Sequence, residues 1–527
     1  MLTGKNFIGN KPAAKGNKKY RTFNPLLNLE NETTFYEATP AEIDEAVALA
    51  QAAFGPYSRK SGSERAAFLR AIADEILALG EPLITTYCSE TGLPEGRAKG
   101  ERGRTMGQLK AFADLLEEGS WVGATIDRAL PEREPIPKPD LRKVMVPLGP
   151  VVVFGASNFP FAFSTAGGDT ASALAAGCPV LLKSHPMHAG TSEMVATAIL
   201  KAAASTGMPN GVFSHLNSSG IEVGQQLARH EGIAAIGFTG SHRGGRALFD
   251  LAAKRKTPIP VFAEMGSINP VVFLPEALEE QGESWARNYA GSITLGSGQF
   301  CTNPGLLLGI ADKGLDNFMK KLSSEILSIA PTSMLHPNIQ GAFEKGKQAA
   351  AAQEQTKVLA DYREEVEANF GRPLVLGVEG ETFLANPALH QEVFGPFALV
   401  VKCRDKHQLQ EILSALEGQL TGTIVGTQKE LPAYTEVTEA LKGRVGRLIF
   451  NGVPTGVEVT AAMQHGGPYP ATTDSRFTSV GTHAINRWVR PVSFQDCPDN
   501  LLPDALKNAN PLGILRMVDG EMTRSSL

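Results

Sequence analysis

The sequence lacks several features that would each have pointed to a particular class of protein. Its five cysteines lie far apart without a C-x-x-C pair, so they predict neither a disulfide framework nor a zinc cluster, and they fit the cytoplasm, a reducing compartment. A large excess of one charge is also lacking, because 50 Lys and Arg residues are spread among 55 Asp and Glu residues. No nucleic-acid partner is therefore expected.

Long apolar runs are missing as well. The basic segment 1–23 is not followed by an apolar stretch, so it does not predict a signal peptide. Residues 144–168 carry no charge, but three prolines, a serine and an asparagine interrupt them. We interpret this segment as a buried strand, a turn and the start of a helix, and expect no membrane partner.

What is present is an alternating α/β pattern. Thr39-Pro40-Ala41-Glu42 is a capping box before a helix, and a second amphipathic helix is predicted over 63–79. From residue 150 short apolar runs alternate with helical segments, which predicts a parallel sheet with right-handed crossovers and hence a Rossmann-like domain. The runs begin at Val151, Pro179, Val212, Ala234 and Pro260.

Later segments predict a second α/β domain. Further apolar runs begin at Leu306, Phe397, Gly422 and Gly446, and helical stretches separate them. The tail after residue 485 is rich in proline and asparagine. We expect it to wrap over a neighbouring surface and not to form a core of its own.

Three side chains are candidates for chemistry. Cys301 follows the flexible segment SITLGSGQF, where a sulfur can be accessible, although a single cysteine is more often a buried small hydrophobe. Glu264 ends an apolar strand at the sheet edge where ligands bind, and Asn158 follows the first strand of that sheet. A carboxylate can activate water and an amide can donate to an oxyanion. A solvated glutamate and a turn asparagine are the alternatives.

A short glycine signal suggests a phosphate site. Gly240 and Ser241 follow another strand and open a helix, whose first N–H groups can face a phosphate, but G-x-G-x-x-G is absent and a simple helix cap at Ser241 explains the pattern equally well. His185 and His188 flank Pro186 without matching carboxylates, so we expect a surface turn and no metal.

Together these segments resemble the aldehyde dehydrogenase superfamily. The shared motifs are N-F-P after the first Rossmann strand, a lysine ending the second, F-T-G-S, a strand-end E-x-G, G-Q-x-C, and E-V-F-G-P at 392–396. The resemblance covers nearly the full chain. Ser267, where most members carry a second glycine, is a departure from the pattern, and so is Pro186, where NAD-preferring members often carry glutamate.

The resemblance implies an α/β fold with a small oligomerisation arm. Residues 1–127 would be the N-terminal part of the cofactor domain, 128–149 the first arm segment, 150–264 the Rossmann-like domain and 265–450 the catalytic domain. Residues 451–527 would return to the cofactor domain, complete the arm and wrap the C-terminus. A homodimer or homotetramer is expected.

The resemblance also implies roles for the site residues. Cys301 would attack the aldehyde carbon, Asn158 would hold the oxyanion, and Glu264, with its pKa raised toward neutrality in a partly apolar tunnel, would activate water against the thioester. The remaining roles concern the cofactor: Lys183, Gly240 and Ser241 would contact its ribose and phosphates, Glu392 would hold the nicotinamide ribose, and Phe394 would pack near the ring.

The branch suggested by both chain ends contains 2-oxoglutarate semialdehyde (2,5-dioxovalerate) dehydrogenases and NADP-dependent fatty aldehyde dehydrogenases. The first substrate is the main hypothesis, in sugar acid or hydroxyproline catabolism, with NADP preferred over NAD because no carboxylate follows Lys183. Arg104 and Phe159 are the candidate substrate contacts. A long-chain aldehyde, a cysteine hydrolase without a recognisable histidine base, and a non-catalytic structural protein remain the alternatives.

Overall fold

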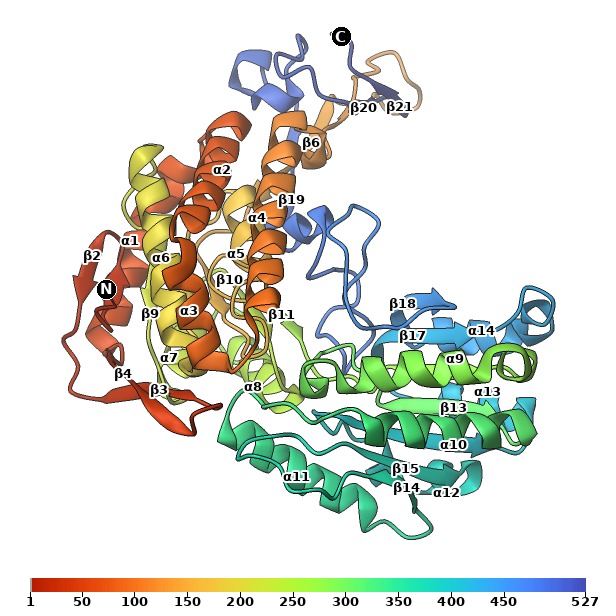
Figure 1. Cartoon of the computed structure of the whole chain (residues 1–527). Coiled ribbons are helices and arrows are strands. Elements are labelled where there is room, and N and C mark those ends of the chain that lie inside the picture. Colours follow the sequence, from red (N-terminus) through yellow and green to blue (C-terminus); the bar gives the residue numbers. More distant parts are fainter. Residues whose placement is uncertain (1) are drawn as a thin grey trace.

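Three sheets organise the chain, and each occupies a different part of the molecule (Figure 1). The structure is a computed structural model that describes residues 2–527. The first sheet lies among the helices of the N-terminal half, the second lies in the part coloured green to light blue, and the third forms an arm beside the C-terminus. The candidate chemistry lies between the first two.

Five strands of the first sheet, β7 to β11, run parallel, as the sequence predicts. Its order is β11-β10-β7-β8-β9-β1-β2, with β1 antiparallel to β9. The central strands are buried on both faces, which explains their continuous apolar sequences. The bounds are β1 Asn6–Ile8, β2 Lys11–Ala13, β7 Val151–Phe154, β8 Val180–Lys183, β9 Phe213–Leu216, β10 Ala235–Thr239 and β11 Val261–Glu264.

Helices cover both faces of this sheet. Val151 and Val153 of β7 belong to the same core as α2 to α6, whereas Val152 belongs to a second core with α1, α7 and α8. The predicted capping box of Thr39 and Glu42 opens α1. The bounds are α1 Pro40–Ser58, α2 Gly62–Ala78, α3 Gly80–Thr91, α4 Glu95–Glu118, α5 Gly168–Ala176, α6 Ala189–Ser205, α7 Glu222–Arg229 and α8 His242–Ala253.

The second sheet has the order β14-β15-β16-β13-β12-β17-β18, and only its edge strand β14 runs antiparallel to its neighbour. Its strands are β12 Pro270–Phe273, β13 Leu306–Ile310, β14 Lys357–Asp361, β15 Leu374–Glu379, β16 Phe397–Cys403, β17 Gln419–Val425 and β18 Val445–Phe450. Its helices are α9 Pro275–Thr294, α10 Lys313–Ser328, α11 Pro337–Ala351, α12 Gly380–Ala385, α13 Lys406–Ala415 and α14 Thr435–Lys442.

The C-terminal tail differs from the prediction made from its sequence. The tail after residue 485 forms strands of a five-stranded sheet, and its Leu506 and Ile514 share a small core with Ile126 and Val144, so it does build a core instead of only wrapping a surface. The arm strands are β5 Thr125–Asp127, β6 Leu141–Pro147, β19 Val489–Gln495, β20 Arg516–Val518 and β21 Glu521–Thr523, and a separate hairpin pairs β3 Lys19–Asn24 with β4 Leu29–Tyr36. Within residues 2–527, no helix is both long enough and apolar enough to span a membrane.

Candidate active site

Cys301 lies on a tight loop that only glycine permits. Gly298 has a φ of +63°, and a Cβ atom there would lie 2.3 Å from the carbonyl carbon of Gly395. The loop of Cys301 is therefore pressed against the segment that carries Glu392 and Phe394. This contact brings the G-Q-x-C and E-V-F-G-P motifs together.

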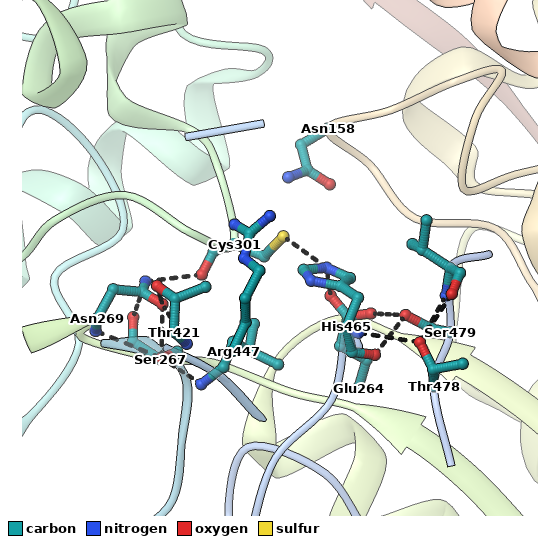
Figure 2. Close-up of polar contacts among 12 residues, drawn as sticks. Asn158, Glu264, Ser267, Asn269, Cys301, Thr421, Arg447, His465, Thr478 and Ser479 are labelled. Carbon is teal, nitrogen blue, oxygen red and sulfur yellow. Dashed lines mark hydrogen bonds and ion pairs between the residues drawn. The ribbon is translucent and has the colours of Figure 1, made fainter. Parts of the chain in front are cut away.

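Glu264 and Cys301 meet through a histidine that the sequence analysis missed. The Nε2 atom of His465 lies 3.5 Å from Cys301 Sγ and 3.0 Å from Glu264 Oε1 (Figure 2). His465 and Glu264 are 1% and 3% exposed. The other carboxylate oxygen of Glu264 accepts a hydrogen bond from Ser479, whose backbone N–H donates to the carbonyl of His465. The chain segment around residues 465–479 thus fixes two of the three groups.

The charges in this cluster oppose ionisation of the sulfur. Burial, together with the negative charge of Glu264, raises the pKa of the Cys301 thiol well above its usual value. Burial by itself would raise the pKa of Glu264, but pairing with His465 and the hydrogen bond from Ser479 outweigh it and leave that pKa below its usual value. The expectation of a raised carboxyl pKa was therefore wrong for the free enzyme, because it overlooked His465.

Asn158 lies beside the Cys301 loop. Its Nδ2 atom donates to the carbonyl of Gln299 at 3.1 Å, and its amide end lies on the sulfur side of the cluster (Figure 2). The loop that carries Asn158 is held by Glu101 of α4, whose Oε1 atom accepts from the N–H groups of Phe161 and Ala162 at 2.8 and 2.9 Å. A buried carboxylate thus fixes the position of the amide.

A second polar network supports the loop of Cys301 from the other side. Asn269 Nδ2 donates to the carbonyl of Cys301 at 2.9 Å, and Thr421 of β17 donates to Asn269 Oδ1, also at 2.9 Å. Ser267 Oγ donates to Gln419 at 2.9 Å. The serine that departs from the family pattern therefore joins the Glu264 segment to the second sheet.

Arg104 of α4 reaches the pocket in front of the sulfur. This pocket has a volume of about 110 Å³, and Phe159, Phe163, Phe300 and His465 are among its other lining residues, along with Cys301. The guanidinium lies over the ring of Phe163, 5.2 Å from its centroid. Within residues 2–527 its Nε and Nη2 atoms are buried without a hydrogen-bond partner. The structure thus places Arg104, one of the two candidate substrate contacts, in the same pocket as Cys301.

The neighbouring aromatic residues divide between pocket and core. Phe159 and Phe163 line the pocket, whereas Phe161 is fully buried and stacks on Tyr87, with 4.8 Å between ring centroids. A second arginine, Arg447 of β18, was not predicted. It donates to the carbonyls of Pro454 and Gly456 and so shapes another wall of the pocket.

A larger cleft opens at the carboxyl ends of the first sheet. It has a volume of about 660 Å³, within the roughly 300–1,000 Å³ range of small-molecule and cofactor sites. Its lining includes Lys183, Gly240 and Ser241, together with the apolar side chains of Phe154 and Leu248. Ser241 caps α8 by accepting from the N–H of Gly244 at 3.3 Å. Burial lowers the pKa of Lys183 to about 8.

Glu392 and Phe394 line a separate small pocket with Ser267 and Gly298. The Oε1 atom of Glu392 lies 3.5 Å from the N–H of Ser267. The predicted site residues thus form three groups: the cluster around Cys301, a large cleft, and a small pocket against the Cys301 loop.

The interpretation of His185 and His188 as a surface turn was wrong. His188 is buried, and its Nε2 atom lies 2.7 Å from the carbonyl of Ala156, while His185 lines the large cleft. Burial lowers the pKa of His188 to about 4, so it is neutral. The turn supports the loop before Asn158 from within the fold.

Comparison with known proteins agrees with this geometry. Residues 12–489 match the aldehyde dehydrogenase family. The chain belongs to that family. It is 48% identical over 99% of both chains to alpha-ketoglutaric semialdehyde dehydrogenase 2 of Azospirillum brasilense, and 45% identical, again over 99% of both, to alpha-ketoglutaric semialdehyde dehydrogenase of Acinetobacter baylyi.

Solved structures of aldehyde dehydrogenases share the fold. The structure of betaine aldehyde dehydrogenase from Staphylococcus aureus in complex with NAD+ superposes with a TM-score of 0.80 at 19% identity, over 94% of this chain and 96% of that one. Family membership disfavours both the hydrolase and the non-catalytic alternatives. His465 escaped the sequence argument because it lies in an irregular segment, QHGGPYPATTDSRF, where no helical or strand pattern marks its direction.

Proposed function

We propose that this aldehyde dehydrogenase oxidises 2-oxoglutarate semialdehyde to 2-oxoglutarate with NADP or NAD. The observation that carries the proposal is Arg104, a half-buried cation whose buried Nε and Nη2 atoms have no acceptor among the described residues, in the pocket that also contains Cys301. The printed names of the two relatives that match over the full chain support the same substrate.

The guanidinium of Arg104 lacks hydrogen-bond acceptors among the described residues. A buried guanidinium whose N–H groups lack acceptors is costly, and a carboxylate can satisfy two of them at once. Arg97, on the same helix, does not share this need, because its guanidinium lies 3.5 Å from Glu101 and stacks on Phe159. Arg104 is therefore our candidate for binding the carboxylate of the substrate.

The size of the pocket supports a short substrate. Its volume of about 110 Å³ is well below the roughly 300 Å³ at which pockets for larger ligands begin. A long-chain fatty aldehyde would need an extended apolar tunnel, and Arg104 would place a charge in it. We therefore place this alternative second.

The chemistry follows from the residues around the sulfur. In its neutral form, His465 Nε2 is placed to take the proton from the Cys301 thiol, which must ionise before it attacks the aldehyde carbon. Asn158 then donates to the oxyanion that develops on the former carbonyl oxygen. A bound NAD(P)+ would supply the acceptor for the hydride that leaves this carbon. Glu264 deprotonates the water that hydrolyses the thioester, and the acid product is released.

The cofactor would occupy the large cleft. Lys183 and Ser241 would contact its ribose and phosphates, with Gly240 allowing close approach, while Glu392 and Phe394 would hold the nicotinamide end. Among the described residues that line the cleft none is Asp or Glu, whereas Lys183 and Arg243 are cations. This lining favours acceptance of the 2′-phosphate of NADP.

The test is a panel of aldehydes assayed by the absorbance of reduced cofactor, with NADP and NAD in parallel. We expect the highest kcat/KM for 2-oxoglutarate semialdehyde and at least equal use of NADP. A kcat/KM that rises steadily with the length of unsubstituted aldehydes, and exceeds that of the oxo acid, would instead establish the fatty aldehyde reading.

We also propose that the enzyme works in the cytoplasm as a homodimer or homotetramer. Two edge strands support assembly, since β18 and β19 each pair on one side only and Phe450 at the end of β18 is 47% exposed. Light scattering of the purified enzyme would measure the mass, and a monomer at micromolar concentration would contradict this proposal.

A further inference from the structure

Three possible metal-binding atoms of the active site lie close together. Cys301 Sγ, His465 Nε2 and a carboxylate oxygen of Glu264 all lie within 4.8 Å of one another. They come from three segments of the chain, so no spacing in the sequence reports them. Sulfur, imidazole and carboxylate are the three ligand types that proteins offer to Zn²⁺.

The distances fit a tetrahedral ion. With Zn–S near 2.3 Å and Zn–N or Zn–O near 2.0–2.1 Å, a tetrahedron has an S–N edge of about 3.6 Å and an N–O edge of about 3.3 Å. The corresponding separations here are 3.5 Å from Cys301 to His465 and 3.0 Å from His465 to Glu264. Two of the three separations therefore match a tetrahedral ion to within a few tenths of an ångström, and the third donor pair, Cys301 and Glu264, lies within 4.8 Å.

One of these donors also lacks a hydrogen bond. Glu264 is 3% exposed, and among the described residues its Oε1 atom has no aligned donor, although His465 Nε2 lies 3.0 Å away, because that nitrogen is directed at the sulfur of Cys301. Its other oxygen is held by Ser479, and the backbone N–H of His465 donates to Thr478. Hydrogen bonds to Ser479 and Thr478 thus hold two of the three ligands in place.

We propose that Cys301, His465 and Glu264 form a reversible inhibitory site for a thiophilic divalent cation such as Zn²⁺. As the S–metal bond forms, the thiol releases its proton to solvent, and the thiolate and carboxylate balance the two positive charges of the ion. The pocket in front of the sulfur leaves the fourth position open to water. A bound ion blocks both the nucleophile and the group that activates water.

Cobalt offers a test that needs neither aldehyde nor cofactor. The full-length enzyme is freed of metal with a chelator and titrated with Co²⁺, and the thiolate-to-cobalt absorption band is followed, with Zn²⁺ as the competitor. We expect one equivalent of Co²⁺ per chain, displaced by Zn²⁺. Cys301→Ala should abolish the band, and His465→Phe and Glu264→Gln should each weaken binding at least tenfold. Cys88→Ala and Cys497→Ala, which change the other two partly exposed thiols, should leave it intact.

Alkylation gives a second measure that does not depend on the folding of any variant. Zn²⁺ should protect Cys301 from iodoacetamide in the unaltered enzyme, as read by peptide mass spectrometry. A band that survives Cys301→Ala, unchanged affinity in Glu264→Gln, or full alkylation in saturating Zn²⁺ would overturn the proposal. Since none of these readings uses turnover, failure of the metal site would leave the aldehyde assignment standing, and failure of that assignment would not remove the metal site.

Discussion

The large cleft and the pocket around Cys301 are built in different ways. The cleft is lined by residues that follow β7, β8 and β10, strands that lie side by side in one parallel sheet. The pocket gathers single side chains from α4, the loop after β7, the Cys301 loop and the segment around His465. A binding cleft can arise from repeated local units, whereas this catalytic pocket depends on contacts between distant segments.

Replacing Cys301 should have the largest effect on turnover, and it distinguishes the pocket from the cleft. Cys301→Ala removes the sulfur that we propose bonds to the aldehyde, so turnover should fall by about 10⁴-fold or more, as for other covalent catalysts. Dinucleotide affinity, measured by quenching of protein fluorescence, should be unchanged because the cleft does not need the sulfur. Residual turnover near the level of the unaltered enzyme would show that the pocket is not where the chemistry occurs.

Glu264→Gln should act at a later step. Loss of the base should slow thioester hydrolysis by about 10²- to 10³-fold. Stopped-flow absorbance should still detect one rapid equivalent of reduced cofactor before the slow phase. Ser479→Ala, which keeps the carboxylate and removes the hydroxyl that donates to Glu264 and to the carbonyl of His465, serves as the milder companion. If the rapid phase disappears with turnover, Glu264 also takes part in activating Cys301.

Arg104→Met should sharpen the assignment of the pocket to a carboxylate. Hydrogen bonds to a charged group contribute about 1.5–3 kcal/mol, so kcat/KM for 2-oxoglutarate semialdehyde should fall about 10- to 100-fold, while that for an uncharged aldehyde of similar length should not. Arg102→Met is the matched control, because Arg102 donates weakly to Gly80 on another face of α4. Equal losses for both aldehydes would indicate a structural role for Arg104.

The pH dependence of thiol reactivity tests the electrostatics of the pocket. Because burial and the charge of Glu264 raise the pKa of Cys301, alkylation of the free enzyme should be slow at pH 7 and should accelerate as pH rises toward that pKa. Glu264→Gln removes the charge, lowers the thiol pKa, and should speed alkylation at pH 7 several-fold. Slower alkylation in this variant would mean that Glu264, and not His465, accepts the proton.

Pro186→Glu should have the smallest effect and should change only the preference between NADP and NAD. A carboxylate near the 2′-phosphate adds a repulsion of about 1 kcal/mol in a water-exposed setting, equivalent to about fivefold in the NADP to NAD ratio of kcat/KM. Pro186→Gln controls for the loss of proline without adding charge. A shift of equal size in both variants would assign the effect to the backbone instead.

Much of the fold followed from local patterns. The parallel strands β7 to β11 coincide with the apolar runs because burial on both faces leaves an uninterrupted apolar sequence. The capping box at Thr39 also formed as expected, since its partners lie within one helical turn. The division into domains and the roles of the individual site residues stay predictions.

The sequence by itself determined the family and the parallel sheet, because these depend on short motifs and on strand periodicity, and it predicted Cys301 as the nucleophile. Only the tertiary structure decided that His465 lies between Cys301 and Glu264, that two guanidinium nitrogens of Arg104 are buried without a partner among residues 2–527, and that the C-terminal tail builds a core with β5 and β6. The physical reason is that such contacts join residues that are far apart in the sequence. The side chains involved occupy irregular segments or ordinary helical positions, and the local sequence there does not indicate which residue they contact.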